Sequence, residues 1–282
     1  MFGRHILATK TDEELRGMRR AGLVVARTLQ ALEESCTSGT TTRRLDALAE
    51  ARIRRLGGRP SFAEVPGYRH TLCVSVNEQV VHGIPGDRVL RDGDIVSIDC
   101  GAIVDGWHGD AAVTVVVGGR QAVSAETEAL VDATREALWA GILAFRVGGS
   151  VGDIGAAVED SLSACGRAAP GGPLTFGIVD GFEGHGIGRE MHMDPPVPNV
   201  KLARKGPKVR PGATVAIEPM ATLGTQATRE LEDGWTAVTC DGSWAAHWEH
   251  TVAVTDRGLW VLTSLDGGQA ELTARGAAFG PV

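Results

Sequence analysis

The sequence has no long apolar run and no excess of positive charge, and each absence excludes a class of protein. No stretch reaches the roughly 18 consecutive apolar residues that a membrane helix needs, and no apolar segment of signal-peptide length follows Arg4 and His5. Acidic side chains outnumber basic ones by 35 to 28, giving a formal net charge of −7. This balance argues against nucleic acid as the main partner. We therefore expect neither a membrane nor a nucleic acid to be what the protein acts on.

Paired cysteines are also lacking. The chain has an odd number of cysteines, widely separated and without a C-x-x-C pair: Cys36, Cys73, Cys100, Cys165 and Cys240. Such a pattern is typical of reduced thiols in the cytoplasm rather than of a disulfide framework. Hydrophobic residues make up 43% and charged residues 22% of the 282 residues, as in an ordinary globular protein of one large or two small domains.

What the sequence does contain is a strong hairpin signal between residues 94 and 118. Two β-branched runs flank Asp105-Gly106, a dipeptide typical of a two-residue turn. With these residues in the turn, Asp110 faces Gly101, and Asp99 lies on the same face as Asp110, roughly 7–8 Å away along the diagonal. Two carboxylates among apolar residues need a compensating cation, for which a metal is the best candidate. For this pair taken alone, the alternative to a metal site is that one carboxylate is solvated at the rim of the protein and the other caps a loop.

Four helices are predicted from capping residues and apolar spacing. Thr11-Asp-Glu-Glu14 matches a capping box, and Ser124 opens a second long helix. A glycine-containing break at residues 38–39 or 148–150 follows each of them, and a shorter helix comes next. Gly22 interrupts the apolar stripe of the first helix and predicts a gap where another element packs close.

The two halves of the chain, about residues 11–118 and 124–255, share a weak repeat in which four short stretches recur in the same order. The repeated stretches that carry acidic residues are 93–99 with 212–218, and 110–115 with 249–254. Facing the halves across a pseudo-twofold axis brings four carboxylates together, which need about two divalent cations. Helices then cover the outer face of the sheet in a single α+β domain over residues 1–282. The small and polar residues 267–282 are expected to be loosely held.

A histidine in a glycine-rich stretch completes the acidic set. His185 lies in E-G-H-G-I-G, which lacks the spacing of a phosphate loop. A lone histidine is more often structural, but one beside Asp99, Asp110, Glu218 and Glu249 is favoured as a ligand. One imidazole and four carboxylates form a hard, oxygen-rich set suited to Mn(II), Fe(II), Co(II) or Zn(II). Two such ions lower the pKa of a shared water, so the site chemistry points to hydrolysis.

Six motifs together resemble the methionine aminopeptidase family. They are H-G-I-P at His82, S-I-D-C-G-A at Ser97, D-G-W-H-G-D-A at Asp105, G-H-G-I-G-R-E-M-H at Gly184, A-I-E-P-M at Ala216 and W-E-H-T at Trp248. The resemblance covers well over half of the chain. It implies the pita-bread fold, a curved antiparallel sheet with a pseudo-twofold repeat, and removal of the initiator methionine from nascent proteins whose second residue is small. The short spacing from His185 to Glu218 resembles a minimal bacterial type I enzyme.

The resemblance also implies a role for each metal-site residue. Asp99 chelates one ion, His185 and Glu218 bind the other, and Asp110 and Glu249 bridge both. The two divalent ions are drawn from Co, Mn, Fe, Zn or Ni, and a water shared between them attacks the first peptide bond.

Further roles follow from the same resemblance. His82 and His192 donate hydrogen bonds to the scissile carbonyl and to the tetrahedral intermediate, and Glu218 carries a proton to the leaving amine. The methionine pocket is formed by Phe62, Tyr68, Cys73, Met191 and Trp235. Core packing is an equal alternative for Phe62. Met191 replaces a common phenylalanine, and Val65 takes an often aromatic position, while His108, His247 and His250 are expected behind the ligands or at the surface.

The partners implied are N-termini of nascent polypeptides and methionyl peptides, close to the ribosome, with the protein acting as a cytoplasmic monomer. A proline-specific or creatinase-like hydrolase is one alternative, although such relatives usually carry a further N-terminal domain, and two helices already occupy the residues before the first strand. A non-catalytic pita-bread binding protein is the other alternative. Such proteins typically lose metal ligands, whereas all five are present here.

Overall fold

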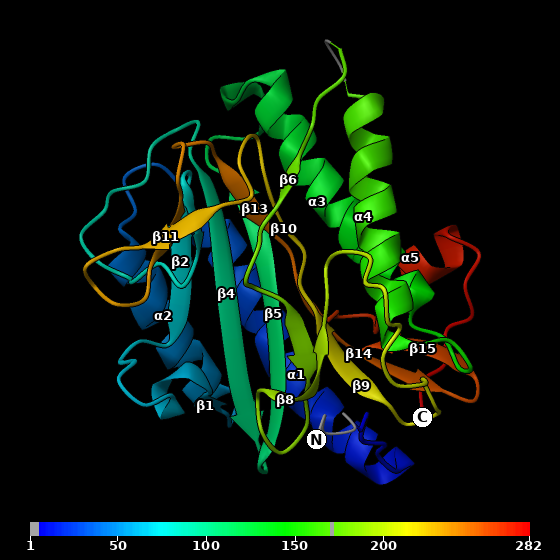
Figure 1. Cartoon of the computed structure of the whole chain (residues 1–282). Helices are drawn as coiled ribbons and strands as arrows, with labels where there is room; N and C mark the ends of the chain where they lie inside the picture. Colours follow the sequence, from blue (N-terminus) through cyan, green and yellow to red (C-terminus); the bar gives the residue numbers. More distant parts are fainter. Residues whose placement is uncertain (1–5, 170–171) are drawn as a thin grey trace.

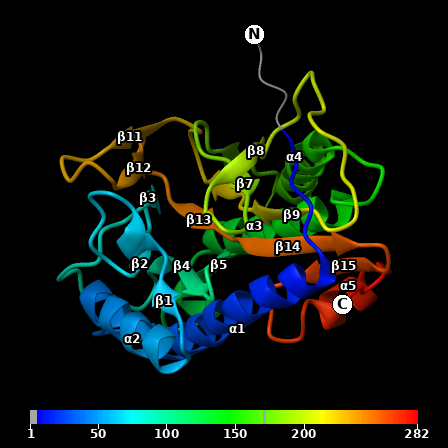
Figure 2. The same ribbon diagram turned by 90° about the horizontal axis from the view of Figure 1, so that it is seen from below.

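Two pairs of helices, one from each half of the chain, flank a set of curved antiparallel strands (Figure 1). The structure is a computed structural model that describes residues 6–169 and 172–282. Helix α1 lies along one side of strands β4 and β5, and α2 packs on α1 and against β1 and β2 (Figure 2). Helices α3 and α4 pack on each other and contact strands of the second half. None of the helices in the described ranges combines the length and the apolarity that crossing a membrane requires.

The first half begins with the predicted helices. The Thr11 side chain accepts a hydrogen bond from the Glu14 amide, and the Glu14 carboxylate accepts one from the Thr11 amide, so the capping box is confirmed. The elements of this half are α1 (Asp12–Ser35), α2 (Thr42–Arg55), β1 (Arg59–Pro60), the 3₁₀ turn η1 (Phe62–Glu64), β2 (Leu72–Val76), β3 (Gln79–Val81), β4 (Ile95–Val104), β5 (Trp107–Val116) and η2 (Arg120–Ala122).

The second half repeats the helix pair and then departs from the first in its strands. Ser124 caps α3, as predicted, and Ser150, within the predicted break, caps α4. The elements are α3 (Ala125–Ala144), α4 (Val151–Arg167), β6 (Gly177–Ile178), β7 (Gly184–Gly186), β8 (Met193–Val197), β9 (Thr214–Ile217), β10 (Met220–Thr222), β11 (Thr228–Glu230), β12 (Ala237–Thr239), β13 (Ala245–His247), β14 (His250–Thr255), β15 (Gly258–Val261) and α5 (Gln269–Ala274).

The predicted hairpin is confirmed in turn and in register. Asp105 and Gly106 both have positive φ, 51° and 76°, as a type I′ turn requires. Gly101 pairs with Asp110, and Asp99 pairs with Ala112. Strand β4 also pairs with β1 and β2, so its register fixes Asp99 against neighbours on both sides.

The two halves join where β5 lies against the start of β14. The Glu249 amide donates to the Ala112 carbonyl at 2.9 Å, and the Ala112 amide donates back to Glu249 at 3.3 Å. The Thr251 hydroxyl adds a second link, because it donates to the Asp110 carbonyl and accepts from the Asp110 amide. Strand β14 continues into a five-stranded sheet of order β15-β14-β9-β7-β8. The seam therefore places residues of both halves at one point.

Close packing at Gly22 follows the sequence prediction. A Cβ on Gly22 would lie 2.1 Å from the Leu262 carbonyl oxygen, and a Cβ on Gly109 would lie 2.8 Å from the Gly22 nitrogen. Helix α1 therefore approaches β5 at backbone contact distance. The apolar residues of α1 and α2, including Val25, Leu29 and Leu45, are buried beneath it.

The C-terminal residues 267–282 differ from the expectation of a loosely held tail. Helix α5 forms there, Leu272 is fully buried, and the Leu259 amide donates to the Ala278 carbonyl. Phe279 packs against the apolar cores of both the main sheet and α1. Most residues of this stretch are small, but Leu272 and Phe279 fix it to the rest of the protein, so its composition alone led to a wrong prediction.

Candidate active site

A cavity of about 500 Å³ opens between the two halves. All of the residues predicted for the site line it: Phe62, Tyr68, Cys73, His82, Asp99, Asp110, His185, Met191, His192, Glu218, Trp235 and Glu249. One end of the cavity is acidic and the other is apolar. The repeat in the sequence thus predicted the convergence, and the structure brings the residues together.

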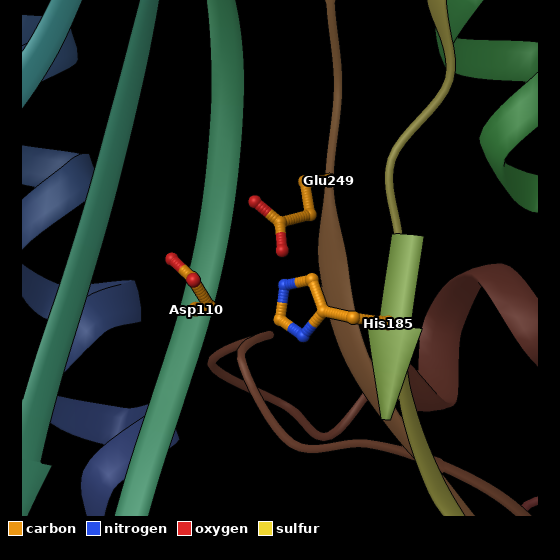
Figure 3. Close-up of side chains that lie close together, drawn as sticks. All are labelled: Asp110, His185 and Glu249. Carbon is orange, nitrogen blue, oxygen red and sulfur yellow. The ribbon is translucent and has the colours of Figure 1, made fainter. Parts of the chain in front are cut away.

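The acidic end is assembled from five separate places in the chain. Asp99 lies within β4 and Asp110 within β5, whereas Glu218 directly follows β9 and Glu249 directly precedes β14. His185 projects from β7. The side chains of Asp110, His185 and Glu249 point toward one another (Figure 3), and one ligand atom from each lies within 4.8 Å of the other two. The His185 Nε2 is 3.5 Å from Glu218 Oε1, which adds a fourth member to the cluster.

Burial without partners makes this cluster electrostatically unfavourable on its own. Asp99 Oδ1, Asp110 Oδ1 and Glu249 Oε1 are buried and make no hydrogen bond within the described residues. Burial raises the pKa of Asp110 to about 7. Burial, and then the charge of neighbouring carboxylates, raises the pKa values of Asp99, Glu218 and Glu249 well above their usual range. A divalent cation would satisfy the free oxygens and offset the repulsion, so these residues fit a metal site.

The histidine of the cluster is held as a neutral ligand. Its Nδ1 lies 2.9 Å from the Gly186 carbonyl oxygen, which leaves Nε2 directed toward the carboxylates. Burial lowers the pKa of His185 to about 4, so the imidazole is uncharged at neutral pH. A neutral imidazole whose second nitrogen bonds a backbone carbonyl is the usual arrangement of a metal-ligating histidine.

Two further histidines stand over the acidic end. The His192 ring lies 4.5 Å from the His185 ring, centroid to centroid. His82 adopts a positive φ of 58° at the end of β3 and packs edge-on against Phe182 and Trp235. Burial lowers the pKa values of both His82 and His192. Each ring is therefore neutral near pH 7 and presents one N–H donor.

The apolar end is formed by a cluster of packed side chains. Phe62, Tyr68, Cys73 and Met191 are buried together, and Trp235, Val65 and Ile84 pack against them. The Tyr68 hydroxyl donates to the Leu72 carbonyl at 2.7 Å, and the Tyr68 ring lies 4.9 Å from the Trp235 ring. Burial raises the pKa of the Cys73 thiol well above its usual range, so Cys73 contributes an uncharged, polarisable wall.

The sequence analysis missed some residues of the site. Phe182, next to the E-G-H-G motif, lines the cavity and packs on His82. The three histidines beside the ligands prove to differ from one another. His108 bonds Ser61, and His250 bonds Thr263. His247 instead faces Glu218, with 3.9 Å between Nε2 and Oε2. Sequence spacing gave no signal for this, because the contact depends on how β13 pairs with β10.

Comparison with known proteins identifies the family. The profile of metallopeptidase family M24 matches residues 16–256. Methionine aminopeptidase 1 of Mycobacterium tuberculosis (strain CDC 1551 / Oshkosh) is 50% identical over 266 residues, which span 93% of this chain and 96% of that protein. The crystal structure of methionine aminopeptidase from Thermotoga maritima has a TM-score of 0.85 at 38% identity, covering 92% of this chain and all of the other.

A more distant likeness concerns the fold. Prolidase from Pyrococcus furiosus has a TM-score of 0.68 at 20% identity, and the match spans 92% of this chain but 66% of the prolidase. The predicted pita-bread architecture is thus confirmed, with its antiparallel strands flanked by helices. The chain belongs to metallopeptidase family M24 and, within that family, to the methionine aminopeptidases.

Proposed function

We propose that this chain removes the N-terminal methionine from polypeptides whose second residue is small, by metal-dependent hydrolysis of the first peptide bond. The observation that carries the proposal is the shape of one cavity. Four buried carboxylates and a neutral histidine meet at one end, and a cluster of apolar side chains lies at the other. Membership in the family supports the same reaction.

The metal-binding residues we propose are Asp99, Asp110, His185, Glu218 and Glu249. Five donor side chains exceed the three protein ligands of a typical single-metal catalytic centre, which supports two divalent ions. A bound divalent metal supplies a Lewis acid that polarises the scissile carbonyl and lowers the pKa of water. The oxygen-rich ligand set does not select among Mn, Fe, Co, Zn and Ni, so supply in the cell would decide the ion.

The remaining residues of the acidic end position the peptide and move its proton. His82 and His192 present neutral N–H donors at the cavity and would hydrogen-bond the carbonyl oxygen as it gains negative charge. Glu218 is buried with a raised pKa, which suits a carboxyl that accepts a proton from water and passes it to the leaving amine.

The apolar end would receive the methionine side chain. Phe62, Tyr68, Met191 and Trp235 supply aromatic and thioether surface, and the Cys73 thiol faces the same space. With the methionine side chain in this cluster, the first peptide bond would lie near the acidic end of the cavity. Approach of the free α-amine to the metal held by Asp99 would then account for restriction to the N-terminal residue.

The protein's setting is also part of the proposal. The five free cysteines, three of them buried, support a reducing compartment, and we assign the chain to the cytoplasm. There it would act as a monomer on N-termini of nascent chains as they leave the ribosome.

A substrate panel tests the function. The metal-loaded protein is assayed on Met-Ala-Ser, on Xaa-Pro peptides and on creatine, with Asp110→Ala as the control. We expect cleavage of Met-Ala-Ser alone, and a loss of about 10³-fold or more in the variant, because a shared metal ligand is removed. Cleavage of Xaa-Pro peptides or creatine would favour the other hydrolases of this fold. Binding of peptides without cleavage would favour a non-catalytic protein.

A further inference from the structure

His247 is a buried imidazole to which the proposed mechanism gives no task. Its residue is 1% exposed, at the end of β13. Its Nε2 is buried and has no hydrogen-bond partner within the described residues. A buried N–H left without a partner costs about 1–3 kcal/mol, so a compensating role for the His247 side chain is expected. The polar atom it faces is Glu218 Oε2, at 3.9 Å.

The backbone of His247 is fixed by the opposite half of the molecule. Its amide donates to the Thr114 hydroxyl at 3.0 Å and to the Ser97 hydroxyl at 3.2 Å, and its carbonyl accepts from Thr114 at 2.7 Å. Ser97 on β4 and Thr114 on β5 are direct partners in the hairpin register, and their hydroxyls lie 3.0 Å apart. The same hairpin that carries Asp99 and Asp110 therefore sets the position of the His247 ring.

Glu218 lies between two imidazoles. Its Oε1 is 3.5 Å from His185 Nε2, and its Oε2 is 3.9 Å from His247 Nε2. Its own backbone is held as well, because the Asn199 side chain donates to the Glu218 carbonyl at 3.1 Å. One carboxylate oxygen thus faces the proposed metal ligands, and the other faces a side chain that lies outside the ligand set.

We propose that His247 is a positioning residue for the Glu218 carboxylate. Its Nε2–H, 3.9 Å from Oε2, reaches hydrogen-bond distance after a small movement of either side chain and then holds the carboxylate. The inference rests on the proposed function, in which Glu218 binds metal and carries a proton. A carboxylate that serves both roles must keep one oxygen toward the metal, and a donor on the other oxygen prevents rotation about the last side-chain bond. Donors behind metal ligands typically change metal affinity or activity by about 10–100-fold when removed.

Three variants of His247 separate positioning from packing. His247→Phe keeps a flat ring without the donor, and His247→Leu removes the donor with less bulk in case the ring does not fit. His247→Gln keeps an N–H donor at about the reach of Nε2. His250→Gln is the matched control, since His250 flanks Glu249 on the other side and bonds Thr263 rather than a carboxylate. Melting temperatures identify any variant that loses stability instead.

The primary measurement is titration calorimetry with Mn(II) alone. We expect the affinity to fall by about 10–100-fold in His247→Phe and His247→Leu, and to stay within about 3-fold in His247→Gln and His250→Gln. Steady-state kinetics on Met-Ala-Ser should show the loss in kcat, with KM within about 2-fold, because Glu218 belongs to the proposed metal ligands and not to the residues proposed to receive the methionine side chain.

Two results would overturn the inference. One is wild-type Mn(II) affinity in the Phe and Leu variants. The other is an equal loss in the Gln variant or in the His250 control, which would indicate packing rather than donation. The calorimetric series does not depend on the substrate. A wild-type protein that binds Mn(II) but leaves Met-Ala-Ser intact would refute the proposed function, and the His247 series would still decide the present question.

Discussion

The two halves of the molecule supply their acidic residues in different ways. In the first half, Asp99 and Asp110 lie inside the paired strands β4 and β5, joined by a two-residue turn. In the second half, Glu218 and Glu249 lie at strand ends, and residues 219–248 intervene between them. Register alone places the first pair. The second pair depends on long-range contacts, such as the paired backbones of Ala112 and Glu249.

The long segment between Glu218 and Glu249 contributes its own residues to the site. Residues 219–248 carry β10 to β13, and they bring Trp235 to the cavity and His247 to Glu218. Both halves line the cavity, the first with Phe62, Tyr68, Cys73 and His82, and the second with Met191, His192 and Trp235. A duplicated unit has kept its helices and its acids and diverged in its connection.

The first helices of the two halves, α1 and α3, also differ in how closely they pack, and this difference has the largest expected effect. Gly22 of α1 touches the backbone of Leu262, whereas Gly141 of α3 would bring a Cβ within 3.0–3.1 Å of methyl groups on Val158 and Ile217. We expect Gly22→Ala to lower the free energy of unfolding by about 3 kcal/mol, since backbone cannot move aside as a side chain does.

Gly141→Ala is the matched variant. A gain in helix propensity of about 1 kcal/mol should offset the tighter packing, so the net change should stay within about 1 kcal/mol. Urea denaturation measures both values. An equal loss in the free energy of unfolding for the two variants would contradict a difference in packing between α1 and α3.

A second test concerns the division between the acidic end of the cavity and its apolar end. Trp235→Ala should lower kcat/KM for Met-Ala-Ser by about 10-fold, mostly through KM, because the variant opens the wall beside Tyr68 and His82. Its Mn(II) affinity should equal that of the wild type, and Trp235→Phe should recover most of the loss. A variant that loses metal affinity would place Trp235 itself among the residues that support the ions.

The smallest expected effect is a pH dependence shared by both halves. Asp110 has its pKa raised from 3.8 to about 7, so it stabilises the metal-free fold at low pH, and this contribution is lost as pH rises through about 7. His185, with a pKa lowered from 6.5 to about 4, acts in the opposite direction, but only below about pH 6.5.

Other buried histidines with lowered pKa values, such as His82, His192 and His247, leave a residual opposing effect between about pH 6.5 and 7.5. Comparison with Asp110→Asn cancels the histidines. Relative to this variant, the melting temperature of the metal-free wild type should fall by about 2 °C between about pH 6.5 and 8, and saturation of the wild type with Mn(II) should abolish the fall because the metal favours the ionised carboxylates. Differential scanning calorimetry checks the sign. A metal-free wild type that gains stability relative to the variant over the same window would contradict it.

Local features of the fold were predictable from sequence. The turn at Asp105-Gly106 and the capping boxes at Thr11 and Ser150 involve residues within a few positions of each other, so propensity alone decides them. The internal repeat then predicted that the acids of both halves converge, because two like units facing each other must bring matching positions together. These residues do line one cavity. The role of each remains a prediction.

Other features depend on pairing between distant segments and left no trace in the sequence. Whether His247 faces Glu218 or solvent is decided by its bonds to Thr114, far away in the chain. The prediction that residues 267–282 are loosely held was wrong for the same reason, since Leu272 is buried through contact with the main core. Composition describes a segment by itself, and these segments take their structure from what they touch.

The reciprocal bonds between Ala112 and Glu249 have a consequence for how the molecule opens. These two amides exchange their hydrogens with the solvent only when the halves draw apart at the seam. Ions held by Asp110 and Glu249, as proposed, would span that same seam and hold the two halves together. Metal binding should therefore slow hydrogen exchange at both amides together. Association of the two halves and formation of the metal-bound enzyme would then be coupled.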